Sequence, residues 1–159
     1  MRATLTVLVA AAALALCPAA TAAAGTVPRF SVPGRAGGIC VDASLKISFP
    51  APPALGSTGA IEVHRADGTL FDRIEAATAK TDRKNIGATV SDTGLPHDFS
   101  YESITIDGRT ALVHLHRQLE YGQTYYVTVD PGVFAGFDGV QDPRSWRFAT
   151  RKRLPTPAI

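Results

Sequence analysis

The sequence predicts an all-β protein, folded as a sandwich or a barrel, and three observations support this class. Apolar and polar residues alternate with a period of two in short stretches across residues 39–150. Turn-forming Gly, Asp and Pro residues separate these stretches. No segment of useful length with a helical period follows the apolar N-terminal block. Many short strands joined by such turns are typical of sandwiches and barrels.

Length and charge narrow the class further. The 159 residues, of which 45% are hydrophobic and 19% charged, have room for one globular domain. This composition excludes a disordered acidic or basic tail protein. A formal net charge of +2 provides no electrostatic footprint for nucleic acid, so we expect no nucleic-acid partner.

The N-terminal block predicts a cleaved signal peptide over residues 1–24. Arg2 supplies the positive start, residues 5–16 are almost entirely Ala, Leu and Val, and the small residues before Gly25 fit a cleavage site. The apolar run is short for a bilayer span. We therefore expect a secreted protein, extracellular or periplasmic, without a membrane partner after cleavage.

Cysteine content excludes an intrachain disulfide in the exported chain. Cys17 leaves with the predicted signal peptide, so Cys40 is the single cysteine that remains. We expect Cys40 to be a small packed residue near the first strand.

Alternation and turn chemistry together predict the strands. We expect strands over residues 45–49, 61–64, 70–74, 103–106, 110–116, 125–129 and 146–150. In the first strand Leu45, Ile47 and Phe49 alternate with polar residues, and the prolines that follow end it. Asp67-Gly68 and Asp107-Gly108 suit hairpin turns, because glycine accepts the positive φ that such turns require.

The late strands have their own signals. Residues 125–129 are β-branched and aromatic, which suits a central strand, and a tight turn at 121–124 leads into it. Residues 130–143 contain several glycines and prolines and predict a loop. In the last strand, 146–150, the alternate residues Trp146, Phe148 and Thr150 share one face.

Five segments lie outside these strands. Residues 25–38 lack periodicity and predict a linker, whereas 75–84 are compatible with either a loop or a brief helix. We expect a short strand around Ile86 and a polar loop over 90–98. The tail, residues 151–159, is basic and then Pro-rich, like the opening of a linker.

Three stretches resemble the bacterial Ig-like domain family typified by the SbsA surface-layer protein. They are CVDASLKISF at 40–49, LEYGQTYYVTV at 119–129 and WRFAT at 146–150. The resemblance implies an Ig-like antiparallel β-sandwich of about seven strands, which would occupy residues 39–150.

A narrower resemblance concerns the Ig-like module found ahead of bacterial pectinesterase catalytic domains. PPALG at 52–56, YYVTVDPGVF at 125–134 and DPRSWRF at 142–148 are similar to it. This resemblance implies a non-catalytic accessory module, structural or a spacer, whose partner is cell-wall polysaccharide such as pectin or a catalytic domain.

The same resemblance predicts that the chain is not an enzyme. Pectinesterases use paired aspartates and an arginine on a long parallel β-helix, to which nothing here corresponds, so no catalytic residue is carried over and no cofactor is expected. Three alternatives stay open: a stand-alone carbohydrate-binding module, an adhesion module that pairs through its edge strands, and the N-terminal piece of a truncated pectinesterase. We expect a monomer.

Aromatic residues that do not all fit inside the domain are the candidates for carbohydrate contact. They are Tyr101, Tyr126, Phe134 and Phe137. Flat aromatic faces can stack on sugar rings while the polar edges of the sugar stay hydrated. The basic run at 151–153 could meet acidic polygalacturonate, or it could simply be solvated.

Two groups are candidates for metal binding. His114 and His116 lie two apart on a predicted strand and so share a face. Asp130, Asp138 and Asp142 share one glycine-containing loop, and calcium takes oxygen ligands from such loops. The competing interpretations are a solvated strand face for the histidines and a structured turn for the aspartates.

Overall fold

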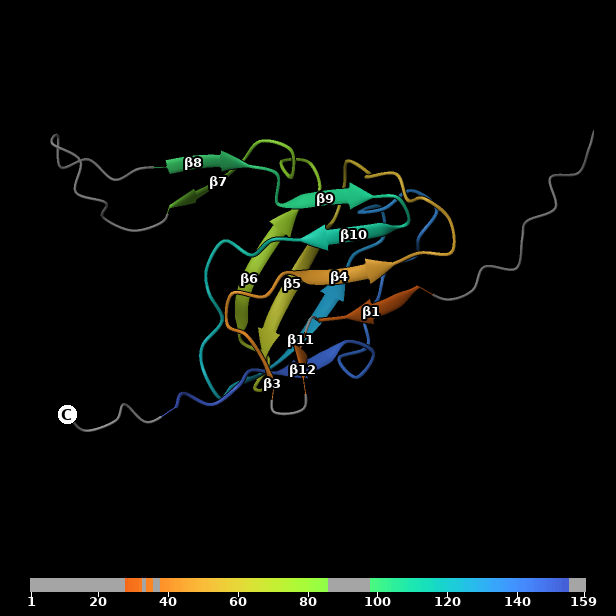
Figure 1. Cartoon of the computed structure of the whole chain (residues 1–159). Helices are drawn as coiled ribbons and strands as arrows, with labels where there is room; N and C mark the ends of the chain where they lie inside the picture. The colour runs from red at the N-terminus through yellow and green to blue at the C-terminus, as the bar shows by residue number, and fades with distance from the viewer. Residues whose placement is uncertain (1–27, 33, 36–37, 86–97, 155–159) are drawn as a thin grey trace, which may run out of the picture.

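The computed structural model describes residues 28–32, 34–35, 38–85 and 98–154 (Figure 1). The predicted signal peptide, the strand predicted around Ile86 and most of the loop predicted over 90–98 lie outside this part of the chain. Within it, no helix has the length and apolar character needed to cross a membrane.

Two four-stranded antiparallel sheets make up the domain and lie one over the other (Figure 1). The first sheet contains β1 (Arg29–Ser31), β4 (Leu45–Ser48), β10 (Thr110–Val113) and β9 (Ile104–Asp107), in that order. The second contains β12 (Arg147–Ala149), β11 (Thr124–Val129), β5 (Ala60–Arg65) and β6 (Leu70–Glu75). The predicted all-β class is confirmed.

Two short antiparallel ribbons accompany the sheets. One pairs β2 (Gly34–Arg35) with β3 (Gly38–Ile39), and the other pairs β7 (Asp82–Asn85) with β8 (Asp98–Tyr101). Figure 1 shows the β7–β8 ribbon projecting from the sandwich beside β9. Residues 82–84, expected in a loop or a brief helix, instead belong to β7, and Asp98, expected in a loop, begins β8.

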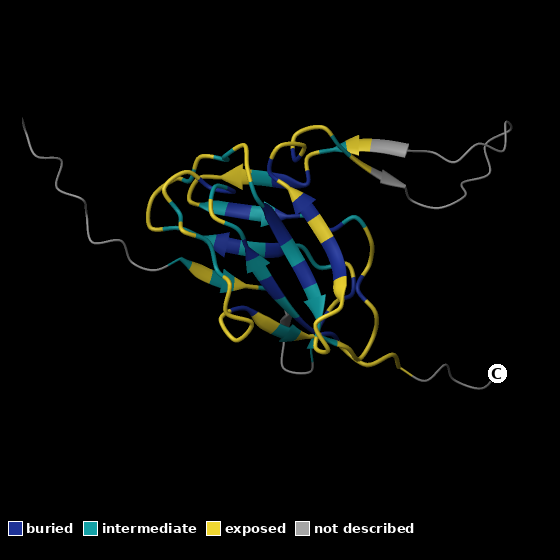
Figure 2. Ribbon diagram, turned by 180° about the vertical axis from the view of Figure 1, so that it is seen from behind, coloured by how far each residue is buried: buried dark blue, intermediate teal, exposed yellow. Residues whose placement is uncertain are grey.

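The core lies between the two sheets, because most strands turn alternate residues inward. In β11, Tyr125, Val127 and Val129 are fully buried, while the residues between them are only partly so. Leu45 and Ile47 of β4 are buried in the same way from the opposite sheet. Figure 2 shows buried and less buried residues alternating along several strands. Burying an aliphatic side chain of this size stabilises the fold by roughly 1.5–3 kcal/mol.

The prediction of a linker over residues 25–38 is wrong for Arg29–Ser31. These residues form β1 and pair with β4, with Phe30 opposite Ile47. The physical reason is an aromatic contact, since Phe30 stacks on the buried Trp146 with 5.0 Å between ring centroids. One apolar side chain in an otherwise irregular stretch adds this strand to the sheet.

Four further predictions need correction. The turn between β9 and β10 consists of Gly108 and Arg109, one residue later than predicted, because Asp107 pairs with Thr110. The strand β10 ends at Val113 rather than reaching residue 116. Cys40 is exposed rather than packed, and its neighbour Val41 takes the buried position. The two main sheets contain eight strands where about seven were expected.

Candidate functional site

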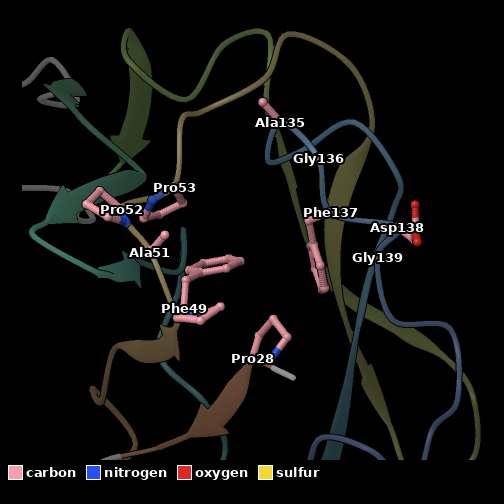
Figure 3. A pocket seen from close by; sticks show the side chains of 11 residues that line it. Pro28, Phe49, Ala51, Pro52, Pro53, Ala135, Gly136, Phe137, Asp138 and Gly139 are labelled. Atoms are coloured by element: carbon pink, nitrogen blue, oxygen red, sulfur yellow. The ribbon is translucent and has the colours of Figure 1, made fainter. Parts of the chain in front are cut away.

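An open hollow of about 550 Å³ lies at one end of the sandwich (Figure 3), and we call it the end groove. One wall is the segment that follows β4, residues 49–53, and the other is residues 135–139 of the loop after β11. Pro28, just before β1, completes it. Three parts of the chain that are far apart in sequence therefore build one concave surface.

Two phenylalanine rings define the groove. Figure 3 shows Phe49 and Phe137 turned toward each other from opposite walls, with 5.6 Å between their centroids and 88° between their planes. Phe134 packs against both rings. Its ring centroid lies 5.0 Å from that of Phe49 and 6.4 Å from that of Phe137, and the residue is 1% exposed. Phe137 thus belongs to the groove surface, whereas Phe134 belongs to the core.

Backbone hydrogen bonds hold the two walls together. Gly56 N donates to Val133 O at 2.8 Å, and Ala135 N donates to Ala54 O at 2.9 Å. The far side of the loop is also held, since Val140 exchanges bonds of 2.7 and 2.8 Å with Val129 at the end of β11. The groove is therefore attached to the sandwich on both sides.

The groove has little charge. Its lining consists of Pro, Phe, Ala and Gly residues, apart from the single carboxylate of Asp138. A lining of apolar side chains with one carboxylate suits a neutral ligand that has an apolar face and hydroxyl donors. A polyanion would meet no cation among these residues.

The three aspartates of the predicted calcium loop do not converge. Asp130 accepts hydrogen bonds from Ala60 N at 3.1 Å and from Gln141 Nε2 at 3.2 Å, and Asp142 accepts one from Arg144 N at 3.0 Å. These bonds organise turns. Asp138 lies in the groove wall instead. In the part of the chain that the structure describes, no three His, Cys, Asp or Glu side chains are placed to hold a metal ion.

The two candidate histidines have separate surroundings. His114 Nδ1 lies 2.9 Å from Ser44 Oγ, and its Nε2 lies 3.3 Å from Thr105 Oγ1. His116 lies instead among carboxylates contributed by β6 and β7. Because β10 ends before both residues, the shared strand face predicted for them does not form.

His116 bridges two aspartates that the sequence patterns did not single out. Its Nδ1 lies 2.8 Å from Asp72 Oδ1, and its Nε2 lies 3.0 Å from Asp82 Oδ2. A carboxylate accepts, so both ring nitrogens donate only when the imidazole is protonated. We call this group the Asp72–His116–Asp82 clamp.

The pKa values within the clamp follow from this geometry. Burial lowers the pKa of His116, but the bonds to Asp82 and Asp72 outweigh burial, and the net shift is upward. Burial raises the pKa of Asp82, yet its bonds to His116 and Ser103 bring it below the ordinary value. Burial, together with the two carboxylates, raises the pKa of the nearby Tyr101 to about 12.

The geometry of the clamp suits a structural link between segments of the chain rather than proton transfer. A general base needs a ring nitrogen free to accept the substrate's proton, and here both nitrogens face carboxylate oxygens. The bonds join the segment after β10 to β6 and to the base of the β7–β8 ribbon. No sequence signal marked Asp72 or Asp82, since they are 44 and 34 residues from their partner.

The remaining aromatic candidates lie apart from the groove. Tyr126 is on the outward face of the second sheet, where it stacks on His64 with 4.9 Å between centroids and 10° between planes. Tyr101 turns its ring edge toward His116 and donates from its hydroxyl to His114 O at 3.4 Å. Of the four predicted contact residues, Phe137 alone lines the groove.

Comparison with known proteins adds no assignment. No protein-family model, no curated protein and no solved structure matches this chain.

Proposed function

We propose that the chain is a secreted, non-catalytic accessory module of the Ig-like class, and that its end groove holds a neutral polysaccharide such as methyl-esterified pectin. The observation that carries the binding role is the apolar groove with Phe49 and Phe137 on opposite walls. Its size, about 550 Å³, falls in the range of roughly 300–1,000 Å³ common for ligand sites.

Sheet order supports the Ig-like class. When the strands of the two sheets are lettered in chain order, with β6 taken as the additional strand C′ beside C (β5), β1-β4-β10-β9 becomes A-B-E-D. The second sheet becomes G-F-C with one further strand beside C. Immunoglobulin-type sandwiches have an A-B-E-D sheet facing a sheet of C, F and G, and some add strands next to C.

A tyrosine near the start of β11 supports the same class. Tyr125 is fully buried, and its hydroxyl accepts a hydrogen bond of 3.0 Å from the backbone N of Glu120. In immunoglobulin-type domains a tyrosine near the start of strand F bonds back to the backbone a few residues upstream. In the lettering above, β11 is strand F.

Charge favours a neutral sugar chain over an anionic one. Sugar rings present apolar C–H faces that bury well against aromatic rings such as Phe137. Methyl esterification removes the carboxylate charge of galacturonate, and the single carboxylate, Asp138, can accept from sugar hydroxyl groups. An ionised polygalacturonate would instead be repelled by Asp138.

The non-catalytic role has support from the clamp. His116, whose pKa is raised despite burial by its two carboxylate partners, has both nitrogens engaged with Asp72 and Asp82. If the chain were a pectinesterase, incubation with methyl-esterified pectin would release methanol. We expect none, and methanol release by the purified protein would overturn this part of the proposal.

Affinity gel electrophoresis tests the binding role. We expect the protein to be retarded by methyl-esterified pectin, and Phe137→Ala to abolish the retardation. Ile106→Ala is the control, because it removes an exposed apolar side chain that lies on β9 and not in the groove. Unchanged mobility of the wild-type protein, or equal loss in both variants, would contradict groove binding.

A further inference from the structure

A second surface lies at the end of the sandwich opposite the groove, and we call it the basic end. It consists of Tyr121 and the exposed run Arg151, Lys152 and Arg153. The groove loop follows the end of β11, whereas Tyr121 precedes its start, so the length of β11 separates the two surfaces. Figure 2 shows the exposed C-terminal segment leaving the sandwich there.

The three cations extend from a fixed piece of backbone. Arg151 N donates to Ile39 O at 3.0 Å, and Arg151 O accepts from Gly122 N at 3.0 Å. Gly38 packs so closely that a Cβ there would lie 2.6 Å from Arg151 N. The backbone of Arg151 is therefore held from two sides, and the run begins from a defined position.

Concave space adjoins this backbone. One hollow of about 590 Å³ is lined by Gly38, Gly122 and the 151–152 backbone, with Leu154 beside them. A second, of about 260 Å³, lies between Tyr121 and the basic run. The three cations therefore border two shallow concave regions of the surface.

Among the described residues, no ion pair neutralises this positive charge. Glu120, next to Tyr121 in the sequence, forms its ion pair with Arg65 at 2.7 Å. None of the ion pairs formed among the described residues includes Arg151, Lys152 or Arg153. Three positive charges therefore face solvent on a short stretch of surface.

Tyr121 adds a flat apolar group to this charge. The residue is 39% exposed, and the guanidinium of Arg153 lies 5.6 Å from its ring centroid. A sugar that lay against this ring would have a cation within reach of a carboxylate on the same sugar. Cations alone suit any polyanion, but an aromatic ring beside them suits an anionic sugar chain.

We propose that the basic end binds a carboxylate-bearing polysaccharide such as polygalacturonate, as a second site that is independent of the end groove. Nucleic acid is the less suitable polyanion, because the formal net charge is only +2 and the patch has three cations. One module would then engage an esterified stretch of pectin at one end and a de-esterified stretch at the other.

Isothermal titration calorimetry with a galacturonate decamer tests this site. The triple variant Arg151→Gln, Lys152→Gln, Arg153→Gln is expected to weaken binding about tenfold, since each exposed charge pair contributes only a small factor to affinity. Tyr121→Leu keeps an apolar side chain but removes the ring, and should weaken binding about fivefold. The control is Arg29→Gln, Lys80→Gln, Arg83→Gln, which removes the same charge elsewhere and should change affinity by less than about twofold.

Two polyanions without uronate sugars complete the test. We expect polyglutamate and single-stranded DNA of matched charge to bind more weakly than the decamer. Tyr121→Leu should leave polyglutamate binding unchanged, because polyglutamate has no ring to stack on the tyrosine. Equal affinity for polyglutamate, tighter binding of DNA, or no measurable binding of the decamer would each overturn the proposal. Phe137→Ala separates the two sites, because it should leave decamer binding intact while pectin retardation is lost.

Discussion

His116 donates two hydrogen bonds to the single carboxylate of Asp72. The backbone N of His116 lies 2.8 Å from Oδ2, and the ring Nδ1 lies 2.8 Å from Oδ1. Asp72 is 8% exposed, so this carboxylate is held in the interior by a residue 44 positions away. The second ring nitrogen extends the same link to Asp82 of β7.

The first prediction is that stability depends on pH through the clamp. His116 has a folded pKa above its ordinary 6.5, so its contribution is fully present below pH 6.5 and is lost as pH rises through the folded value. Asp82 has a folded pKa below its ordinary 3.8, so its contribution is present above pH 3.8 and is lost as pH falls further. We expect maximal stability from these groups between pH 3.8 and 6.5.

Thermal denaturation across this pH range checks the prediction. His116→Gln should lower stability by about 1 kcal/mol at pH 6 and remove much of the decline between pH 6.5 and higher pH. His64→Gln is the matched control on β5, and it should retain the wild-type decline. If His116→Gln kept the full loss of stability above pH 6.5, groups other than His116 would be its cause.

The second prediction concerns β1. Phe30→Ala removes the ring that stacks on Trp146 and should lower the free energy of unfolding by about 2 kcal/mol, less than for a fully buried ring. Urea denaturation measures the change. Arg29→Ala, at an exposed position of the same strand, should alter stability by less than about 0.5 kcal/mol. Equal midpoints for Phe30→Ala and wild type would exclude a structural role for β1.

The third prediction tests the loop that forms one wall of the groove. Gly139 has a φ of 81°, and a Cβ there would lie 2.2 Å from Val129 O, so Gly139→Ala should destabilise by about 2–3 kcal/mol and weaken pectin retardation. Gly108 has a φ of 53° but nothing within 4 Å of a Cβ. Gly108→Ala should therefore cost only about 1 kcal/mol. If both variants lost the same stability, the short distance between a Cβ at Gly139 and Val129 O would not be the cause of the destabilisation.

The fourth prediction concerns the buried hydroxyl of Tyr125. Tyr125→Phe leaves Glu120 N without its 3.0 Å acceptor and should destabilise by about 1–2 kcal/mol in urea denaturation. The neighbouring Tyr126 is on the outward face, and Tyr126→Phe should be close to neutral. Equal effects of the two substitutions would contradict a specific role for the Tyr125 hydroxyl.

Much of the second sheet could be predicted because its signals are local. The strands expected at 61–64, 70–74 and 125–129 match β5, β6 and β11 to within two residues at either end. A period of two, with glycine turns between strands, is contained in a few consecutive residues. Such patterns need no knowledge of the partner strand.

The groove and the clamp could not be predicted, because they depend on contacts between distant segments. In the sequence Phe49 continues the alternation of the core residues Leu45 and Ile47, so the pattern indicates a core residue. Its place in the groove depends on the loop that carries Phe137, which folds across from it. Asp72 lies beside the buried Phe71, just where the β5–β6 pairing shifts register, so strict alternation fails there. Strand β1 was missed because its three residues are too few to show a period.

Chemical-shift mapping by NMR tests the central proposal most directly. Titration with a methyl-esterified oligogalacturonide should shift the backbone amide signals of Phe137, Asp138 and Gly139, while those of Tyr121 and Lys152 stay in place. Shifts confined to the basic end, or no shifts at saturating ligand, would contradict the assignment of the end groove as a site for neutral polysaccharide.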